Sequence, residues 1–459
     1  MQSDSRYITL DAMRGFAVMG ILAMNIIGFA MPEWAYITPA AYGGDSVADR
    51  GSWFLSFILI DGKMRGLFSL LFGASMMLVI DRATAKGESA AHVHYRRMVW
   101  LMLFGLAHYF LIWFGDILFL YAIVGMIAFR FRDWPVRRLV IAALIIFGLG
   151  LVLWGLQFGA LQWLQFVATQ PDAPANTVRQ YREMMASSSF DMNPAAELAL
   201  HRGAYGGIVA DKLSDWSAPL STLLESICET LPLMMIGMAT NKSGFITGAW
   251  DVSEYRRWAF WLVPLGLLLT TLLAGWMIFV NYDRITALAL FFFWGAIPRL
   301  MLTIGYAALL ILLIRKYHDH PMLAHVAAAG RAAFSNYLGT SIIMTTIFYG
   351  YGFGLFGHVI PERSFVPVDH QRSREPAPGK PDQARGAEST ETWRGTSRGL
   401  QAVPSRRSAK YTQAAAPSCP PKRDGTPPQC CWRPAPARPS APGKTDLCRP
   451  YAPGQTDQK

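Results

Sequence analysis

The sequence predicts an all-α protein: a polytopic transmembrane helical bundle of about nine spans, followed by a disordered C-terminal tail. Only 16% of its residues are charged, whereas soluble domains usually carry about 25%. Apolar runs that are long enough to cross a lipid core recur along residues 1–357, and the loops between them alternate between basic and acidic. The predicted domains are therefore a transmembrane helical domain over residues 1–357 and a tail over residues 358–459.

Each expected span is an apolar run of about 20 residues, the length that a helix needs to cross a bilayer. The run 98–129 would form a straight helix of about 48 Å, which is too long for one span. Gly115 and Asp116 interrupt this run, and basic residues flank both of its ends. We therefore expect a helical hairpin with its tip at Gly115–Asp116, and a re-entrant hairpin is the alternative. The nine expected spans are 10–30, 65–80, 98–114, 116–131, 139–163, 219–240, 258–280, 287–314 and 334–356.

The charges of the loops predict the orientation, because Lys and Arg resist translocation. Loops on one side of the expected bundle are basic, and those on the other side carry more acids than bases, so we expect a cytoplasmic N-terminus. Within the largest outer loop, Ala175–Met185 is expected to form a short surface helix. The basic loops are 81–97, 130–138, 241–257 and 315–320, and the outer ones are 31–52 and 164–218.

The tail differs in composition from the body of the chain. Residues 361–459 hold 17 Lys or Arg and 9 Asp or Glu, so they carry +8 of the formal net charge of +11. Such a proline-rich, basic segment cannot bury enough apolar surface to offset the entropy of ordering. The positive charge is therefore a property of the tail, and it gives no case for a nucleic-acid partner.

Charged and amide side chains near the first two spans are the first candidates for function. A charge inside a bilayer costs at least about 2.5–3.5 kcal/mol on insertion scales, so it needs a reason to be there. Asp11 and Arg14 are three residues apart and can pair on one helix face. Asn25 lies eleven residues further on, where an amide can also serve only as a helix–helix contact. Lys63 lies just before the second span, and snorkelling toward water is its alternative role.

The hairpin and the sixth span carry further candidates. His108 lies in the outer half of the hairpin, and Asp116 lies at its tip. A His beside a carboxylate can act as a general base, and a satisfied structural His is the alternative. Glu225 and Glu229 share one helix face at i, i+4. Two carboxylates in a low dielectric repel each other, so at least one should be protonated or paired with a base.

The start of the ninth span carries Arg331 and Asn336, which we expect at the cytoplasmic face. The sequence contains no GxGxxG, P-loop, HExxH or GxSxG motif. Its five cysteines form no CxxC pair, so we expect no metal.

Four segments together carry a resemblance to a known family. They are RYITLDAMRGFAVMGILAMN, KMRGLFSLLFG, GLAHYFLIWFGDILFLYAIVG and GRAAFSNYLGTS. Over residues 6–357 their order and spacing resemble the YeiB-like family of bacterial inner-membrane proteins, which carry a domain of unknown function. The opening helix also resembles the wider transmembrane acyltransferase group, which includes heparan-alpha-glucosaminide N-acetyltransferase and the acyltransferase-3 enzymes.

The chain departs from these families in three ways. Acyltransferase-3 enzymes have a catalytic His at the position of Asn25. The glucosaminide enzymes place their His in the first outer loop, yet loop 31–52 contains none here. YeiB-like proteins continue with another apolar span and a short ending of the type GPxEWxWR, whereas this match stops near His358. A natural disordered tail and a shifted reading frame in GC-rich DNA are both open, and the abrupt end favours the frameshift.

The residues and the resemblance together predict an acyltransferase-like protein of the bacterial inner membrane. It would move an acyl group from a cytoplasmic thioester donor, acyl-CoA, to an outward-facing small-molecule or glycan acceptor, with membrane lipid as its surroundings. His108 would be the base, oriented by Asp116. One alternative is a transporter of a small solute in which Glu225 and Glu229 carry protons, and another is a non-catalytic membrane scaffold. The expected substrate-binding residues are Arg14, Asn25, Lys63, Glu229, Arg331 and Asn336.

Overall fold

The computed structural model describes residues 2–44, 46–187 and 193–358, with side chains from Ile8 onward. Within these ranges every regular element is a helix, so the predicted all-α class is confirmed. The predicted tail and its two interpretations lie outside the described residues, apart from His358. The helices are α1 (Gln2–Ala30), α2 (Trp34–Ile37), α3 (Val47–Leu59), α4 (Lys63–Ala85), α5 (Ala90–Leu111), α6 (Leu118–Ala128), α7 (Val136–Ala168), α8 (Ala175–Met185), α9 (Ala195–His201), α10 (Tyr205–Ser214), α11 (Ala218–Lys242), α12 (Val252–Phe279), α13 (Arg284–Ala289), α14 (Ala296–Lys316), α15 (Pro321–Arg331) and α16 (Ala333–Phe348).

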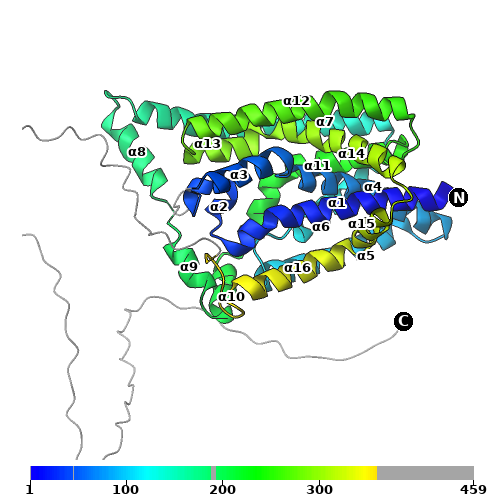
Figure 1. Ribbon diagram of the computed structural model, residues 1–459, viewed down its shortest axis with the longest axis horizontal. Coiled ribbons are helices and arrows are strands. Elements are labelled where there is room, and N and C mark those ends of the chain that lie inside the picture. The colour runs from blue at the N-terminus through cyan, green and yellow to red at the C-terminus, as the bar shows by residue number, and fades with distance from the viewer. Residues whose placement is uncertain (1, 45, 188–192, 359–459) are drawn as a thin grey trace, which may run out of the picture. The chain divides into compact units, whose positions relative to one another are not determined.

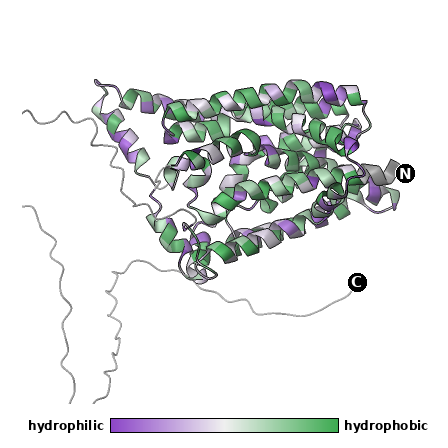
Figure 2. Cartoon of the chain, in the orientation of Figure 1, coloured by the Kyte–Doolittle hydropathy of each residue, from purple (hydrophilic) through white to green (hydrophobic). Residues whose placement is uncertain are grey.

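The long helices run side by side, with the N-terminus at one end of the bundle (Figure 1). Hydrophobic residues cover the flanks of these helices, and hydrophilic ones gather near their ends (Figure 2). This is the pattern of a helical membrane protein. In the described part of the chain, six segments are long and apolar enough to cross a bilayer: Ile8–Ala30, Val47–Ala85, Val136–Ala168, Ala218–Lys242, Val252–Phe279 and Ala296–Lys316.

The count of nine spans stays a prediction, because three expected spans do not reach this length and apolarity. Helix α6 has 11 residues and α16 has 16, both short of the roughly 20 that a straight crossing needs. Helix α5 has 22 residues, and its first two turns are polar and basic. The expected span 287–314 is interrupted by a π-helical turn, Leu290–Trp294, so the apolar helix begins at Ala296.

Helices α5 and α6 pack against each other as the two arms of a hairpin, with residues 112–117 between them. Gly105 makes this close packing possible, because a Cβ at that position would lie 2.3 Å from Phe119 N. The predicted hairpin with Gly115 and Asp116 at its tip is thus found. Because its second arm, α6, has only 11 residues, a re-entrant hairpin remains the alternative to two full membrane spans.

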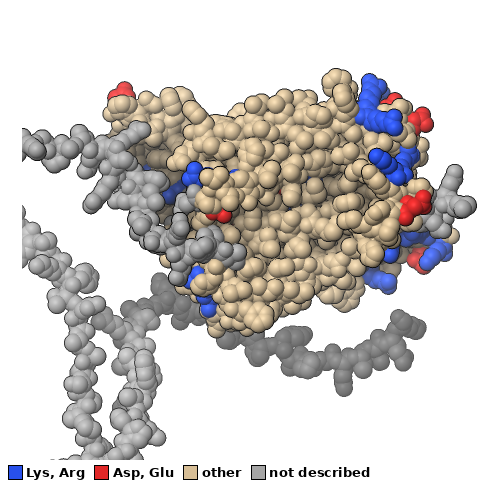
Figure 3. Space-filling model, viewed as in Figure 1, with Lys and Arg blue, Asp and Glu red and all other residues tan. Residues whose placement is uncertain are grey.

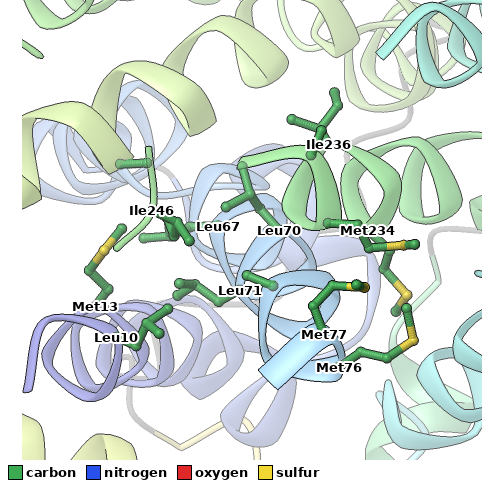
Figure 4. Packing of buried hydrophobic residues seen from close by; sticks show 14 of the residues in the cluster. Leu10, Met13, Leu67, Leu70, Leu71, Met76, Met77, Met234, Ile236 and Ile246 are labelled. Carbon is green, nitrogen blue, oxygen red and sulfur yellow. The ribbon is translucent and has the colours of Figure 1, made fainter. Parts of the chain in front are cut away.

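Small residues set the closest helix crossings. A Cβ at Gly73 of α4 would meet Met234 O at 2.0 Å, and a Cβ at Gly237 of α11 would meet Leu70 O at 1.9 Å. Helices α1 and α15 approach in the same reciprocal way at Gly15 and Gly330. Such contacts let backbones pack tightly where lipid gives no hydrophobic drive between helices. The side chains around the first crossing are leucines, isoleucines and methionines, among them Leu67, Leu70, Leu71, Met76, Met77 and Met234 (Figure 4).

The end of the bundle away from the N-terminus is closed by a structure that we call the distal cap, built around Phe29, Trp113, Ile208, Tyr349 and Phe356. After α16 the chain folds back, and its backbone joins the end of α1 through a Gly357 N to Ala30 O hydrogen bond of 2.7 Å. Arg202 Nε donates to Phe356 O at 2.8 Å. Helix α8 occupies Ala175–Met185, so the expected surface helix is confirmed.

Candidate functional site

A cavity of about 520 Å³ is lined by residues from the N-terminal part of α1 and from the helices packed around it. It lies among α1, α4, α5, α6, α15 and the first turn of α16, and we call it the basic cavity. Lys and Arg gather at the end of the molecule that carries the N-terminus, and the flanks beside it are almost free of charge on the face shown in Figure 3. The lining residues are Leu10, Asp11, Arg14, Val18, Ile21, Phe68, Leu71, Phe72, Ser75, Met76, Leu78, Val79, Arg82, His94, Arg97, Met98, Leu101, Ile117, Leu118, Tyr121, Gly330, Arg331, Ala333, Phe334 and Tyr337.

Four arginines and one aspartate give this lining a formal charge of +3: Arg14, Arg82, Arg97 and Arg331 against Asp11. Arg14 Nη1 donates to Asp11 Oδ1 at 2.8 Å, so the pair expected from their spacing of three is confirmed. Arg14 Nη2 also donates to the hydroxyl of Ser75 on α4. Because guanidinium groups recognise phosphates through paired N–H donors, the cavity suits a phosphate-bearing ligand.

The inner end of the basic cavity is closed by two tyrosines. The Tyr337 hydroxyl donates to Gly115 O at 3.0 Å and accepts from Ile117 N at 3.3 Å. It therefore holds the hairpin tip from the cavity side. The Tyr121 hydroxyl lies 2.7 Å from Ser69 Oγ on α4, so it ties α6 to α4.

His108 and Asp116 form a buried pair just beyond Tyr337. His108 Nδ1 lies 3.0 Å from Asp116 Oδ1, and the two residues are 1% and 8% exposed. This is an ion-pair separation, but the two atoms are not aligned for a hydrogen bond. Asp116 Oδ2 accepts from Phe119 N at 2.8 Å, which fixes the carboxylate at the start of α6. The hairpin thus brings together the two residues that the sequence singled out for catalysis.

The imidazole of His108 is enclosed by aromatic rings on two sides. Tyr337 lies 5.1 Å away on the cavity side, and Trp113 of the distal cap lies 6.5 Å away, both between ring centroids. Trp113 is itself held by an Nε1–H donation to Gly28 O at 3.3 Å. His108 Nε2 has no hydrogen-bond partner among the described residues. His108 is therefore adjacent to the basic cavity but does not line it.

A second polar cluster joins α4, α11 and α14. Glu229 Oε1 accepts from Arg299 Nε at 3.1 Å, and Glu229 Oε2 accepts from Arg65 Nη2 at 3.2 Å. The expectation that at least one of the two glutamates is paired with a base is met by Glu229, while Glu225 is exposed on the same helix. Lys63 is 2% exposed, and its ammonium donates to Phe57 O. Neither Glu229 nor Lys63 lines the basic cavity.

The remaining expected binding residues divide in the same way. Arg331 lines the basic cavity. Asn336 Nδ2 donates to Ala329 O at 2.9 Å, which links the first turn of α16 to α15. Asn25 is half-buried on α1 and does not line the cavity. Of the six expected binding residues, only Arg14 and Arg331 therefore share the cavity.

Sequence reasoning missed three residues whose patterns were visible. His94 precedes His108 by 14 residues, which puts both within about 40° on one face of a helix. Arg97 follows His94 by three, so it faces the same cavity. Arg299 lies within an apolar run, where the cost of an intramembrane charge should have marked it as functional or paired; it is the partner of Glu229.

Comparison with known proteins places the chain in a family. A family model described as "Protein of unknown function (DUF418)" matches residues 240–366, which include Arg299, Arg331 and Tyr337. The "Uncharacterized protein YeiB" of Escherichia coli (strain K12) is 30% identical over 369 residues, covering 77% of this chain and 86% of that protein. The chain belongs to the YeiB-like family.

Two further relatives come from Bacillus species. The "Uncharacterized protein YxaH" of Bacillus subtilis (strain 168) is 30% identical over 374 residues, which are 78% of this chain and 85% of that protein. The "Uncharacterized 39.9 kDa protein in amylase 3'region" of Bacillus acidopullulyticus is 38% identical over 128 residues, 28% of this chain and 34% of that protein. No solved structure matches this family member significantly. The family resemblance predicted from the four sequence segments is confirmed.

Proposed function

We propose that this chain is an acyltransferase-like protein of the bacterial inner membrane with a cytoplasmic N-terminus. In this proposal it moves an acyl group from a cytoplasmic acyl-CoA to an outward-facing small-molecule or glycan acceptor. The observation that carries the proposal is a +3 cavity next to a buried His–Asp pair: Tyr337 lines the cavity, and its ring also lies beside that of His108. The donor phosphates would be held at one end of this path and the acceptor deprotonated at the other.

The basic cavity supports the donor half of the proposal. Its volume of about 520 Å³ lies within the usual range for small-molecule sites, about 300–1,000 Å³. Arg14 is held in place by Asp11 and Ser75, so little side-chain entropy is lost when it binds an anion. Arg331, at the end of α15, and Arg97 of α5 both line this cavity.

The His108–Asp116 pair supports the chemical half. His108 Nε2 would take a proton from the acceptor O–H or N–H as the acceptor atom forms a bond to the thioester carbonyl carbon. Collapse of the tetrahedral intermediate would break the C–S bond, and His108 would return the proton to the leaving thiolate. Asp116, fixed by Phe119 N, would orient the ring and stabilise the imidazolium. Tyr337 would have to leave Gly115 and Ile117 for the two substrates to meet.

A transporter of a small solute is the competing function. It would need Glu225 and Glu229 to carry protons, yet both carboxylate oxygens of Glu229 accept hydrogen bonds from guanidinium groups. Each protonation would break these charge-assisted contacts, which are worth about 1.5–3 kcal/mol apiece. This cost favours a structural role for Glu229 and the transferase proposal over proton-coupled transport.

The decisive experiment measures acyl-CoA binding and thioester cleavage by the full chain in lipid nanodiscs. Arg14→Ala and Arg331→Ala should each weaken binding in a salt-sensitive way, because each removes a charge-assisted contact. His108→Ala should lower thioester cleavage by about 10²–10⁴-fold with binding intact. If both arginine variants bind acyl-CoA as the wild type does, the basic cavity is not the donor site.

Two matched variants keep the result specific. Arg257→Ala removes an exposed arginine of α12 that does not line the cavity, so binding should be unchanged. His325→Ala removes an exposed histidine of α15 and should leave cleavage intact. Proton-coupled solute uptake into vesicles, with no acyl-CoA binding, would instead support the transporter.

A further inference from the structure

A second hollow of about 400 Å³ lies on the outer surface between α5 and α16, beside the basic cavity. We call it the lateral groove. It is open to the surroundings of the bundle, and its walls are aromatic apart from two arginines and one leucine. Its lining residues are Arg96, Arg97, Trp100, Leu101, Phe104 and Phe334.

The polar and apolar parts of the lateral groove are separated along its length. Arg96, Trp100 and Phe104 follow one another at intervals of four, so they form one strip on the face of α5. From Arg96 to Phe104 this strip extends about 12 Å at 1.5 Å per residue. Phe104 meets Phe334 of α16 edge to face at 5.5 Å. The groove thus begins with positive charge and continues as an aromatic channel.

The aromatic side chains of the groove are widely exposed. Trp100 is 58%, Phe104 46% and Phe334 40% exposed. Exposed aromatic rings beside a pair of arginines suit an amphipathic ligand whose anionic group is followed by a hydrocarbon chain. A soluble anion would leave the rings without a partner, and an uncharged lipid would leave the arginines without one.

The lateral groove also communicates with the basic cavity. Arg97, Leu101 and Phe334 line both hollows. A ligand in the groove would therefore touch the walls of the cavity from the membrane side. An ordinary lipid neighbour on a smooth helix face would make no such contact.

We infer that the lateral groove binds an anionic phospholipid of the leaflet at the basic end. Its phosphate lies against Arg96 and Arg97, where guanidinium donors give charge-assisted hydrogen bonds. One acyl chain lies along Trp100, Phe104 and Phe334. This site does not depend on the acyl-transfer proposal, because lipid selectivity can exist in an enzyme, a transporter or a scaffold.

The experiment is native mass spectrometry of the full chain, exchanged from detergent into mixed micelles of phosphatidylglycerol and phosphatidylcholine. We expect at least one phosphatidylglycerol to be retained, with about tenfold preference over phosphatidylcholine. Arg96→Ala should abolish most of this preference, because Arg96 belongs to the groove and not to the cavity. Phe104→Ala should lower the retention of phosphatidylglycerol by several fold.

Matched variants separate a specific site from general lipid contact. Arg257→Ala removes an exposed charge on α12, and Phe260→Ala removes an aromatic ring of the same helix that is 68% exposed. Both should leave retention unchanged. Equal retention of the two lipids, or equal effects of Arg96→Ala and Arg257→Ala, would mean an ordinary lipid shell and would overturn the inference.

Measurement of acyl-CoA binding on the same samples distinguishes this inference from the proposed function. Arg96→Ala should keep wild-type acyl-CoA binding, whereas Arg14→Ala should keep phosphatidylglycerol preference. If the wild-type chain prefers phosphatidylglycerol but does not bind acyl-CoA, the proposed function is refuted and the lipid site is not. If the wild-type chain binds acyl-CoA but shows no lipid preference, the lipid-binding inference is refuted and the proposed function is not.

Discussion

Glu229 connects three helices through one carboxylate, and its replacement by Gln tests how much this connection stabilises the bundle. The side chains of Glu229 and Arg299 are 10% and 7% exposed, whereas that of Arg65 is 32% exposed. Glu229→Gln keeps the shape of the side chain but removes its charge. It leaves the buried guanidinium of Arg299 without a counter-charge, so we expect a large loss of stability.

The expected magnitude follows from the distances. Opposite charges 3.1 Å apart, the separation of Arg299 Nε and Glu229 Oε1, attract by about 5 kcal/mol at an effective dielectric constant of about 20. The cost of desolvation offsets part of this attraction, but loss of one partner from a buried pair costs about 3–5 kcal/mol. Arg65 should contribute less than Arg299, because its side chain is 32% exposed and that of Arg299 is 7% exposed. Replacement of both Glu229 and Arg299 by Met should recover more than half of the loss.

The assay is unfolding of the purified chain in detergent, followed by the fluorescence of its 15 tryptophans. Glu225→Gln is the matched control, because Glu225 lies one turn earlier on α11 and is exposed. We expect Glu225→Gln to have the same unfolding temperature as the wild type. The unfolding temperature of Glu229→Gln should be several degrees lower. If the two variants unfold together, the ion pairs contribute no net stability and the electrostatic argument fails.

Three further predictions concern the ends of the bundle. In a cysteine-free background, a Cys at Gln180 should react with an impermeant reagent from outside and a Cys at Ser253 should not, because the alternating basic loops put them on opposite sides. Burial lowers the pKa of His201 in α9 to about 4, so the folded state favours the neutral ring. Its stabilising effect is therefore present above about pH 6.5 and is lost as the pH falls toward 4, and His201→Gln should remove this acid sensitivity from unfolding curves. Burial also lowers the pKa of Lys212 in α10 to about 8, and its amine has no hydrogen-bond partner among the described residues. Lys212→Met should then raise the free energy of unfolding at pH 7 by about 1–3 kcal/mol, with the gain disappearing above about pH 10.5.

Each of these three has a contrary result. If the Cys at Ser253 is labelled from outside and the Cys at Gln180 is not, the predicted topology is inverted. Every residue assigned here to the cytoplasmic or the outer side would then lie on the opposite side. A wild-type chain whose stability between pH 6.5 and 4 parallels that of His201→Gln would show that His201 binds a proton in the fold at no cost. Equal stability of Lys212→Met and the wild type at pH 7 would mean that the amine is solvated.

Local features were predictable from the sequence because they depend on neighbours along the chain. Helix α8 follows from the pattern of Ala175–Met185, and the Asp11–Arg14 pair follows from a spacing of three on one helix. The meeting of His108 and Asp116 follows from the position of the hairpin tip, since a turn at residues 112–117 brings both arms together. In each case the residues involved are at most ten apart.

The composition of the basic cavity could not be predicted, because it depends on how distant helices cross. Arg14 and Arg331 line one cavity because Gly15 and Gly330 allow α1 and α15 to touch, with a Cβ at Gly330 lying 1.7 Å from Asp11 O. The Glu229–Arg299 pair spans 70 residues. Hydropathy indicates which polar residues should be kept away from lipid. It does not indicate which helices pack together, because many helix arrangements would bury these residues equally well.

Access to His108 is the step on which the proposed chemistry depends. Tyr337 separates its ring from the basic cavity through two hydrogen bonds, which contribute about 0.5–1.5 kcal/mol each. Movement of Tyr337 therefore costs about 1–3 kcal/mol, which is no more than the contribution of one or two charge-assisted phosphate contacts at Arg14 and Arg331. A ligand shifts a conformational equilibrium only by its difference in affinity for the two states. The two substrates must therefore gain a contact that the closed state hides, and the unpartnered Nε2 of His108 offers one to the acceptor.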